Sequence, residues 1–289
     1  MKKSILFIIN PNSGHKRGTK TIKLIPKCLD ATKFEYSYQL TTHAKHAIEL
    51  AAKAVEDKVD IVVAVGGDGL VNEVFQCLVH TDTAFSIIPM GSGNGIARSL
   101  GIAMNVKTAL TNLNSGNITK IDTVLFNGQP YLGVAGIGFD GFIAWEFSKT
   151  SKRGFWAYLK LIFRQVLGYR SSTFLIHDGL RHWKFDAFIV TIANGQQYGN
   201  DAFIAPQAEL DNGLLDLVVV KNHSKWFSPL LAIQVMTKNI HKSRHVEIIR
   251  GEKFQIKTSY DYAHIDGEPI SPKNENEIEI LPKSLSIYR

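Results

Sequence analysis

Three glycine-rich segments carry the residue types that could bind a phosphate group. They are Asn10-Pro11-Asn12-Ser13-Gly14, Gly66-Gly67-Asp68-Gly69 and Gly91-Ser92-Gly93-Asn94-Gly95, and each follows a short apolar run. Glycine lets the backbone turn sharply and approach a phosphate without a Cβ clash. A helix that starts there points N–H groups with partial positive charge at the same place. The carboxylate of Asp68 could bind Mg²⁺ or accept a proton from an attacking hydroxyl.

For any one of these segments, the alternative is an ordinary strand-to-helix turn without a ligand. In a doubly wound parallel sheet, however, the carboxyl ends of neighbouring strands can converge on one crevice. Three such segments in one chain are therefore much stronger evidence than one. They predict a phosphate-binding crevice at the carboxyl edge of a sheet.

The elements expected to position these segments alternate between strand and helix. Continuous apolar runs predict buried strands at residues 4–9, 61–65 and 85–90, and alternation predicts a further strand at 34–40. Helices are predicted at residues 16–29, 44–55, 70–79, 96–100 and 106–113, the second of them with Thr42 as its N-cap. This order predicts an α/β domain with a doubly wound parallel sheet.

The pattern changes near residue 120. Asn127-Gly128 and Asp178-Gly179 are hairpin signals between apolar segments. Strands are predicted at residues 172–176, 182–193, 214–220, 246–249, 254–257, 278–281 and 285–288, with helices near 154–167 and 225–238. We therefore predict two domains: an N-terminal α/β nucleotide-binding domain at residues 1–122, to which the last strand could be added, and a C-terminal antiparallel β-sandwich domain at residues 123–289.

The composition limits the classes of binding partner that this chain is expected to have. The 289 residues carry a formal net charge of +7, which favours anionic partners such as nucleotides, nucleic acid or an acidic membrane. Because the basic residues are dispersed and no RNA- or DNA-reading motif occurs, nucleic acid is not expected. No apolar stretch approaches the roughly twenty residues of a membrane span, so the cytoplasm is the expected location. Cys28 and Cys77 are expected to be buried free thiols.

Other motifs are weaker. Gly136–Gly141 fits the G-x-G-x-x-G pattern, but no acidic residue ends a strand about twenty residues later, as a dinucleotide site needs. Gly18-Thr19-Lys20-Thr21 lacks the glycine that directly precedes the lysine of a P-loop. The ten histidines show no H-E-x-x-H or Cys/His grouping, so zinc is not predicted.

The glycine segments, taken with later motifs, resemble the diacylglycerol kinase catalytic-domain superfamily. That group includes soluble bacterial diacylglycerol kinases, sphingosine kinases and ceramide kinases. The resemblance continues in order through Gly136-Ile137-Gly138-Phe139-Asp140, Ala193-Asn194-Gly195 with Tyr198-Gly199, Leu210-Asp211-Asn212-Gly213 and Asp266-Gly267-Glu268. It thus spans nearly the whole chain, and it implies transfer of the γ-phosphoryl group of ATP to a lipid hydroxyl.

The resemblance also implies site residues. ATP would be held by Asn10, Pro11, Asn12, Ser13, Gly14, Thr41, Gly66, Gly67, Asp68, Gly69, Asn72, Gly91, Ser92, Gly93 and Asn94. Asp266 and Glu268 would assist catalysis, and Asp68 would either organise Mg²⁺ or act as the base. A structural Mg²⁺ would bind at Glu209, Asn212 and Leu214, where Asn212 replaces the usual Asp.

The lipid is left open. Gly95 stands where bacterial diacylglycerol kinases usually have Asp, so a sphingoid or ceramide-like substrate has nearly equal weight with diacylglycerol. The substrate would be met transiently at the inner membrane face, and a homodimer remains open. The aromatic stretch 155–163, edged by Lys152, Arg153, Lys160 and Arg164, is expected either at an anionic interface or as a core helix.

Two alternatives to a lipid kinase stay open. NAD kinases share the Gly-Gly-Asp-Gly segment, but they usually keep an acidic Asn-Glu pair that Ala193-Asn194-Gly195 lacks. The other alternative is a nucleotide- or lipid-binding regulator without turnover. The retained carboxylates Asp68, Asp266 and Glu268 argue against it.

Overall fold

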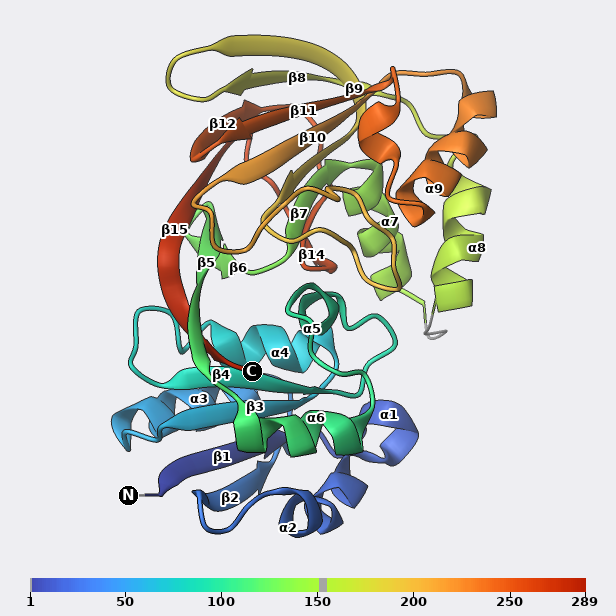
Figure 1. The fold of residues 1–289 in the computed structure, drawn as a ribbon. Helices are drawn as coiled ribbons and strands as arrows, with labels where there is room; N and C mark the ends of the chain where they lie inside the picture. The colour runs from blue at the N-terminus through green and yellow to red at the C-terminus, as the bar shows by residue number, and fades with distance from the viewer. Residues whose placement is uncertain (1, 151–154) are drawn as a thin grey trace. The chain divides into compact units, whose positions relative to one another are not determined.

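The chain forms two compact units. The structure, a computed structural model, describes residues 2–150 and 155–289. The first unit consists of Met1–Asp122 and Pro282–Arg289, and the second of Thr123–Leu281. Two strands, β5 (Ile118–Phe126) and β15 (Glu275–Tyr288), have residues in both units (Figure 1).

The first unit is built on a parallel sheet with the strand order β4-β3-β1-β2. Its strands are β1 (Lys3–Ile9), β2 (Phe34–Leu40), β3 (Ile61–Gly66) and β4 (Ala84–Pro89). Every residue of β3 and β4 is buried, which explains their continuous apolar runs. The end of β15 runs parallel to β4, with Ile287 opposite Phe85. The two strands predicted at 278–281 and 285–288 are therefore one continuous strand.

Helices cover both faces of this sheet (Figure 1). On one face, α2 and α6 share a core with Ile5, Phe7 and Ile9 of β1. On the other face, α3 and α4 pack against each other. The helices are α1 (Ser13–Lys16), η1 (Gly18–Lys23), α2 (Ile25–Cys28), α3 (His46–Glu56), α4 (Asp68–Phe75), α5 (Gly95–Ser99), α6 (Val106–Asn112) and η2 (Leu113–Ser115). This arrangement confirms the predicted doubly wound α/β fold.

Three details of the first unit differ from prediction. The helix expected at 16–29 is divided into α1, η1 and α2, and Pro26 lies in the first turn of α2, where its missing N–H costs nothing. The helix expected from Thr42 begins only at His46, because Lys45 takes a left-handed conformation before it. Cys28 is buried as expected, but Cys77 is only partly buried.

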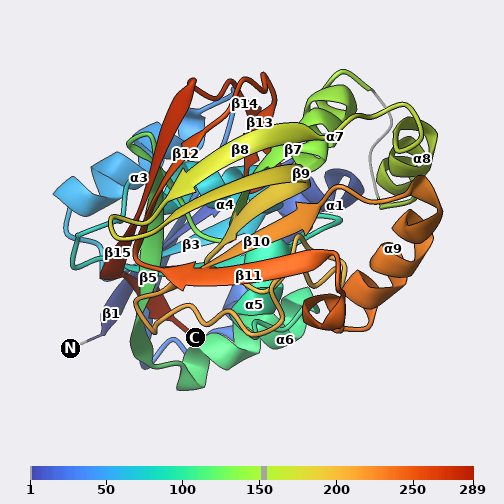
Figure 2. The same ribbon diagram turned by 90° about the horizontal axis from the view of Figure 1, so that it is seen from above.

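The second unit is antiparallel. Its strands are part of β5, with β6 (Gln129–Tyr131), β7 (Val134–Gly138), β8 (Ser172–His177), β9 (His182–Ala193), β10 (Leu215–Lys221), β11 (Val246–Gly251), β12 (Lys253–Lys257), β13 (Ala263–Ile265), β14 (Glu268–Ile270) and part of β15. The long strand β9 joins them, because it pairs with β7, β8 and β10 (Figure 2). The inward side chains of these strands share one core, as expected of a sandwich.

Helices border this second sheet system. The predicted α8 (Phe155–Gln165) and α9 (Ser228–Met236) are present, with η3 (Lys225–Phe227) and η4 (Ile240–Lys242) flanking α9. The helix α7 (Phe139–Ser148) was not predicted; it follows β7 directly, so the Gly136–Gly141 segment is a strand-to-helix turn. Within the described parts of the chain, no helix is both long and apolar enough to span a bilayer.

Candidate functional site

The loops that carry the predicted phosphate-binding residues leave the first sheet at the same edge. The N–H of Asn10 donates to the carbonyl of Val65 at 3.1 Å, and the N–H of Met90 donates to Gly66 at 2.8 Å. The N–H of Thr41 donates to the carbonyl of Ile9 at 3.0 Å. The backbone therefore ties the ends of β1, β2, β3 and β4 together at the carboxyl edge, where ligands bind in open α/β sheets.

The second and third glycine segments touch each other through their backbones. A Cβ added to Gly91 would lie 2.7 Å from the Cα of Gly67, and one added to Gly67 would lie 3.2 Å from the Cα of Gly91. A Cβ on Gly93 would lie 3.0 Å from a carboxylate oxygen of Asp68. Because any side chain would push the two loops apart, glycine at these positions maintains their close approach.

Asn94 shapes its own loop. Its Oδ1 accepts a hydrogen bond from the N–H of Gly91, and its Nδ2 donates to the carbonyl of Gly91, both at 2.8 Å. Its backbone is left-handed, with φ of 50°. The Asn94 amide is therefore committed within the turn, whereas Ser92 at the tip of the loop is exposed.

The carboxylate of Asp68 lies at the start of α5. Its Oδ2 accepts a hydrogen bond from the N–H of Asn94 at 2.8 Å. Burial raises the pKa of the Asp68 carboxyl, and backbone hydrogen bonds from Asn94, Gly95 and Ile96 partly oppose this rise. The helix start that was expected to approach a phosphate thus faces the Asp68 carboxylate.

The remaining predicted residues of the first unit surround these loops. Asn10 accepts a hydrogen bond from the N–H of Asn12 at 2.9 Å, and Gly14 takes a φ of 59° close to Met90. Asn72, in α4, is buried, and its Oδ1 has no hydrogen-bond partner among the described residues. An unpaired buried amide oxygen is costly, so a donor from a water or a ligand would stabilise it. The other predicted positions, Pro11, Ser13, Thr41 and Gly69, are partly exposed.

The two acids of the Asp-Gly-Glu segment have different environments in the second unit. The carboxylate of Asp266 accepts three backbone hydrogen bonds, from Leu132 at 3.0 Å and from Gly133 and Val134 at 2.9 Å each. Glu268 is exposed at the start of β14. Asp266 therefore fixes the turn to the segment before β7, and Glu268 projects from that fixed turn.

A buried polar cluster lies next to this turn and was missed by sequence reasoning. Oδ2 of Asp140 accepts hydrogen bonds from Thr191 and Tyr198, both at 3.0 Å, and lies 3.4 Å from Nε2 of His264. Nδ1 of His264 accepts from the N–H of Gly267 at 3.2 Å, so its proton is on Nε2, toward Asp140. Burial, with the nearby Asp140 charge, raises the pKa of Tyr198 well above its usual range.

This cluster depends on a glycine. A Cβ added to Gly136 would lie 1.9 Å from Oδ2 of Asp140 and 2.8 Å from Nε2 of His264. The G-x-G-x-x-G pattern at Gly136–Gly141 thus makes room for a carboxylate of the protein itself. In the sequence, the only signal for the cluster was the ordered resemblance of its motifs, because Asp140 and His264 are 124 positions apart.

The loop predicted to hold a structural Mg²⁺ does not favour a cation. Oδ1 of Asn212 accepts the N–H of Leu214 at 2.9 Å, which occupies one of the two lone pairs of this oxygen. The Arg250 guanidinium is paired with Asp216 at 2.7 Å, and the charge of Glu209 acts on it. With a neutral amide in place of one carboxylate and the positive charge of Arg250 acting on the other, these residues fit Mg²⁺ less well than two carboxylates would.

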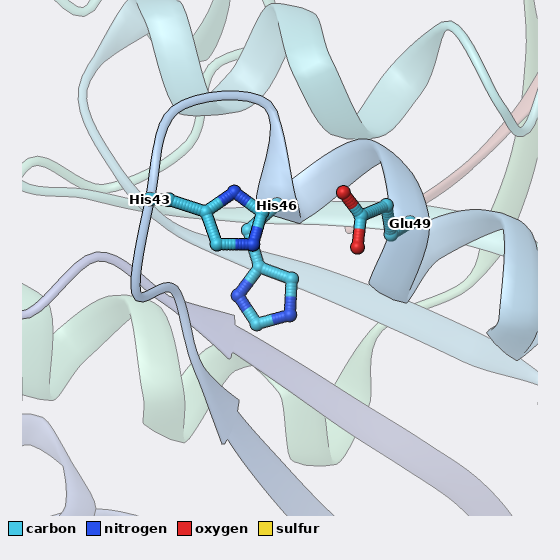
Figure 3. A group of neighbouring side chains, drawn as sticks. All are labelled: His43, His46 and Glu49. Atoms are coloured by element: carbon cyan, nitrogen blue, oxygen red, sulfur yellow. The ribbon is translucent and has the colours of Figure 1, made fainter.

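One group of side chains in the described residues has the composition of a metal site. The candidate ligand atoms of His43, His46 and Glu49 all lie within 4.8 Å of one another (Figure 3). The two imidazole rings are stacked, with centroids 4.5 Å apart and planes at 20°. Nδ1 of His46 accepts the N–H of Thr42 at 3.1 Å. Stacked rings do not direct their lone pairs at one point, so we assign this group to the start of α3 and not to a metal site.

Two family models match the chain in sequence order. Residues 4–126 match the family model of the diacylglycerol kinase catalytic domain. Residues 133–289 match the model described as the YegS C-terminal NAD kinase beta sandwich-like domain. The lipid kinase YegS of Escherichia coli is 30% identical over 263 residues, which cover 81% of each chain.

Solved structures share the fold. A diacylglycerol kinase structure from Bacillus anthracis aligns with a TM-score of 0.75 over 99% of this chain and 96% of that chain, at 21% identity. A second solved structure from that organism aligns with a TM-score of 0.83 at 21% identity, over 99% of this chain and 94% of that one. The family models and the YegS relative place the protein in a class of kinases, and the solved structures show that its fold is diacylglycerol kinase-like. Within that class, it belongs to the YegS-like lipid kinase family.

Proposed function

We propose that this protein transfers the γ-phosphoryl group of ATP to a hydroxyl of diacylglycerol or of a sphingoid or ceramide-like lipid. The observation that carries the proposal is the backbone contact between Gly67 and Gly91 beside the Asp68 carboxylate. Phosphoryl transfer needs positioning and charge neutralisation more than covalent chemistry, and glycine loops at strand ends provide a rigid cradle for that purpose.

In this proposal, Asp68 holds the Mg²⁺ that accompanies ATP. The residue type fits, because the carboxylate supplies the hard oxygen that Mg²⁺ prefers. Burial raises the pKa of this carboxyl, so a nearby cation would stabilise its charged form. When bound, the cation would neutralise charge on the phosphate oxygens. The residues around Asp68 keep it in place, since the N–H of Asn94 fixes its Oδ2.

The proposal is tested by ADP release with Mg-ATP and vesicles containing diacylglycerol, sphingosine or ceramide. Release that depends on one lipid, and is lost in Gly91→Ala, is expected, since a Cβ there meets Gly67 and separates the two loops. The same rate of ADP release in the absence of all three lipids would count against a lipid substrate.

Two other outcomes would favour the alternatives. The second unit matches a model described as NAD kinase beta sandwich-like, so NAD is included as an acceptor. Phosphorylation of NAD, with none of any lipid, would replace the proposal by a NAD kinase. ATP binding without turnover on any acceptor would instead identify a regulator.

Separate roles are expected for the two acids of the Asp-Gly-Glu turn. Asp266→Asn should lower the free energy of unfolding by about 1–3 kcal/mol, because the amide cannot accept all three backbone hydrogen bonds in the same way. Glu268→Gln should leave it within about 0.5 kcal/mol, because Glu268 is exposed. Both should lower ADP release, Glu268→Gln without any loss of stability.

Urea denaturation and lipid-dependent ADP release, measured on the same preparations, distinguish these roles. Glu252→Gln, at another exposed glutamate of the second unit, is the matched control and should change neither quantity. Equal unfolding free energies for Asp266→Asn and the wild type would contradict the anchoring role of Asp266.

A further inference from the structure

Exposed apolar side chains concentrate on and beside two helices of the second unit. Trp226 is 93% exposed and Leu167 is 74% exposed. Six of the exposed large apolar residues lie here: Phe163, Leu167, Trp226, Leu230, Ile233 and Met236. We call them the α8–α9 surface; in both ribbon views the two helices lie side by side at one end of this unit (Figures 1 and 2).

The spacing places these residues on outward-facing stripes. Phe163 and Leu167 are four positions apart along α8 and the turn after it, and Leu230 and Ile233 are three apart on α9. The opposite faces pack inward, because Leu161 of α8 and Leu231 of α9 lie against or within one core cluster. Large apolar residues rimmed by polar ones and left in solvent mark interaction sites.

The aromatic stretch at 155–163 combines features of both environments expected for it. Tyr158, Leu161 and Ile162 pack against the core, as in a core helix. Phe163 faces solvent, as an interfacial residue would. Lys152 and Arg153 lie outside the described residues, and the surface is extended instead by α9, which the sequence did not connect with it.

The charge of this region has one sign. Residues 155–170 and 222–245 contain seven Lys and Arg and no Asp or Glu, which equals the formal net charge of +7 of the whole chain. Lys160, Arg164 and Lys242 are exposed. Among the residues that the structure describes, no carboxylate forms an ion pair with any of the seven. Lys225, Lys238 and Arg244 lie over aromatic rings of the protein. The exposed cations Lys160, Arg164 and Lys242 are therefore available to an anionic partner.

We propose that the α8–α9 surface docks on an anionic lipid bilayer. Trp226, Leu167 and their apolar neighbours would enter the headgroup and acyl boundary, where tryptophan is favoured, and the cations would contact lipid phosphates. A second copy of this chain is a poor occupant, because a symmetric contact would bring two sets of seven cations together. The inference extends the proposed function by assigning the surface through which a lipid acceptor is approached.

The test is co-sedimentation of the full chain with phosphatidylcholine vesicles, with and without phosphatidylglycerol. No acceptor lipid or ATP is added, so binding is measured apart from kinase activity. Wild type should bind the anionic vesicles more tightly, and Trp226→Ser with Leu167→Ser should weaken that binding by roughly tenfold or more. Lys160→Gln should weaken it by roughly fivefold, and less so at high salt.

Matched controls come from the same unit. Leu180 is 90% exposed but lies in the loop between β8 and β9, so Leu180→Ser should bind as the wild type does. Lys253 is paired with Glu279 on β15, so Lys253→Gln is the charge control and should also bind the vesicles as the wild type does. Thermal melting should be unchanged in all of these variants, because each altered side chain is exposed.

Three results would overturn the proposal. They are equal binding to neutral and anionic vesicles, equal loss of binding in Leu180→Ser, and a dimer that dissociates in Trp226→Ser while vesicle binding persists. The proposed function is separable, since ADP release on detergent-dispersed lipid should survive in Trp226→Ser. Vesicle binding without any kinase activity would remove the proposed function and leave the docking surface standing.

Discussion

Asp68→Asn is expected to reduce lipid-dependent ADP release by about 10²-fold or more while leaving the protein at least as stable at neutral pH. The loss follows from removing the carboxylate that would hold Mg²⁺ or accept a proton, since such groups contribute about 10²–10⁴ in rate. The unchanged or higher stability of the variant is expected because burial raises the pKa of Asp68 and so disfavours its charged form. A neutral amide of the same shape avoids that cost.

The pH dependence of the unfolding free energy tests the same expectation in a second way. The folded pKa of Asp68 lies above its unfolded value of 3.8, so between these two values the folded state binds more protons. The contribution of Asp68 to unfolding free energy therefore falls as pH rises through this window. Asp68→Asn lacks this contribution, so its stability relative to wild type should increase from low pH to neutral pH.

Urea midpoints across that window, with ADP release at neutral pH, check both parts. Asp82→Asn, at an exposed aspartate of the same unit, is the control and should resemble the wild type in both measurements. A strongly destabilised Asp68→Asn protein at neutral pH would show that the charged hydrogen bond to Asn94 outweighs the cost of burial. That result would contradict the prediction.

Gly136→Ala is expected to destabilise the second unit by about 3 kcal/mol or more. The new methyl group would lie 1.9 Å from Oδ2 of Asp140, so the carboxylate must move. Its hydrogen bonds from Thr191 and Tyr198 and its approach to His264 would be broken in a buried environment. Overpacking alone costs about 1–3 kcal/mol, and a disrupted buried polar pair adds to it.

Gly168→Ala is the matched control, because a Cβ there meets nothing within 4 Å and the backbone has no left-handed φ. It should change the free energy of unfolding, measured by urea denaturation, by less than about 0.5 kcal/mol. In a double-mutant cycle with Asp140→Ala, the cost of Gly136→Ala should fall sharply, since its clash partner is gone. Additive costs would show that Gly136 does not accommodate the cluster.

The turn that carries Glu268 connects these predictions. Asp266 anchors it to the backbone of residues 132–134, and His264 binds the N–H of Gly267 while facing Asp140. Gly136→Ala should therefore also disturb Glu268, although Glu268 itself has an exposed side chain. The stability measured by urea and the activity measured by ADP release should both fall in Gly136→Ala, whereas only the activity should fall in Glu268→Gln.

The sequence by itself determined the parts of this protein that depend on local pattern. The buried strands β3 and β4 were predictable because a strand covered on both faces must be apolar at every position. The glycine loops at 66–69 and 91–95 were predictable because close backbone approach excludes side chains. The hairpins at Asn127 and Asp178 followed from turn chemistry.

Only the tertiary structure decided which distant groups meet. The pairing of Asp140 with His264, the capture of three N–H groups by Asp266 and the joint surface of α8 and α9 each join segments far apart in the chain. Helix α7 was missed because the glycines at its start favour a turn and give no sign of a helix after it. These features depend on the free energy of burial and on contact geometry summed over the whole chain, which no local window of residues contains.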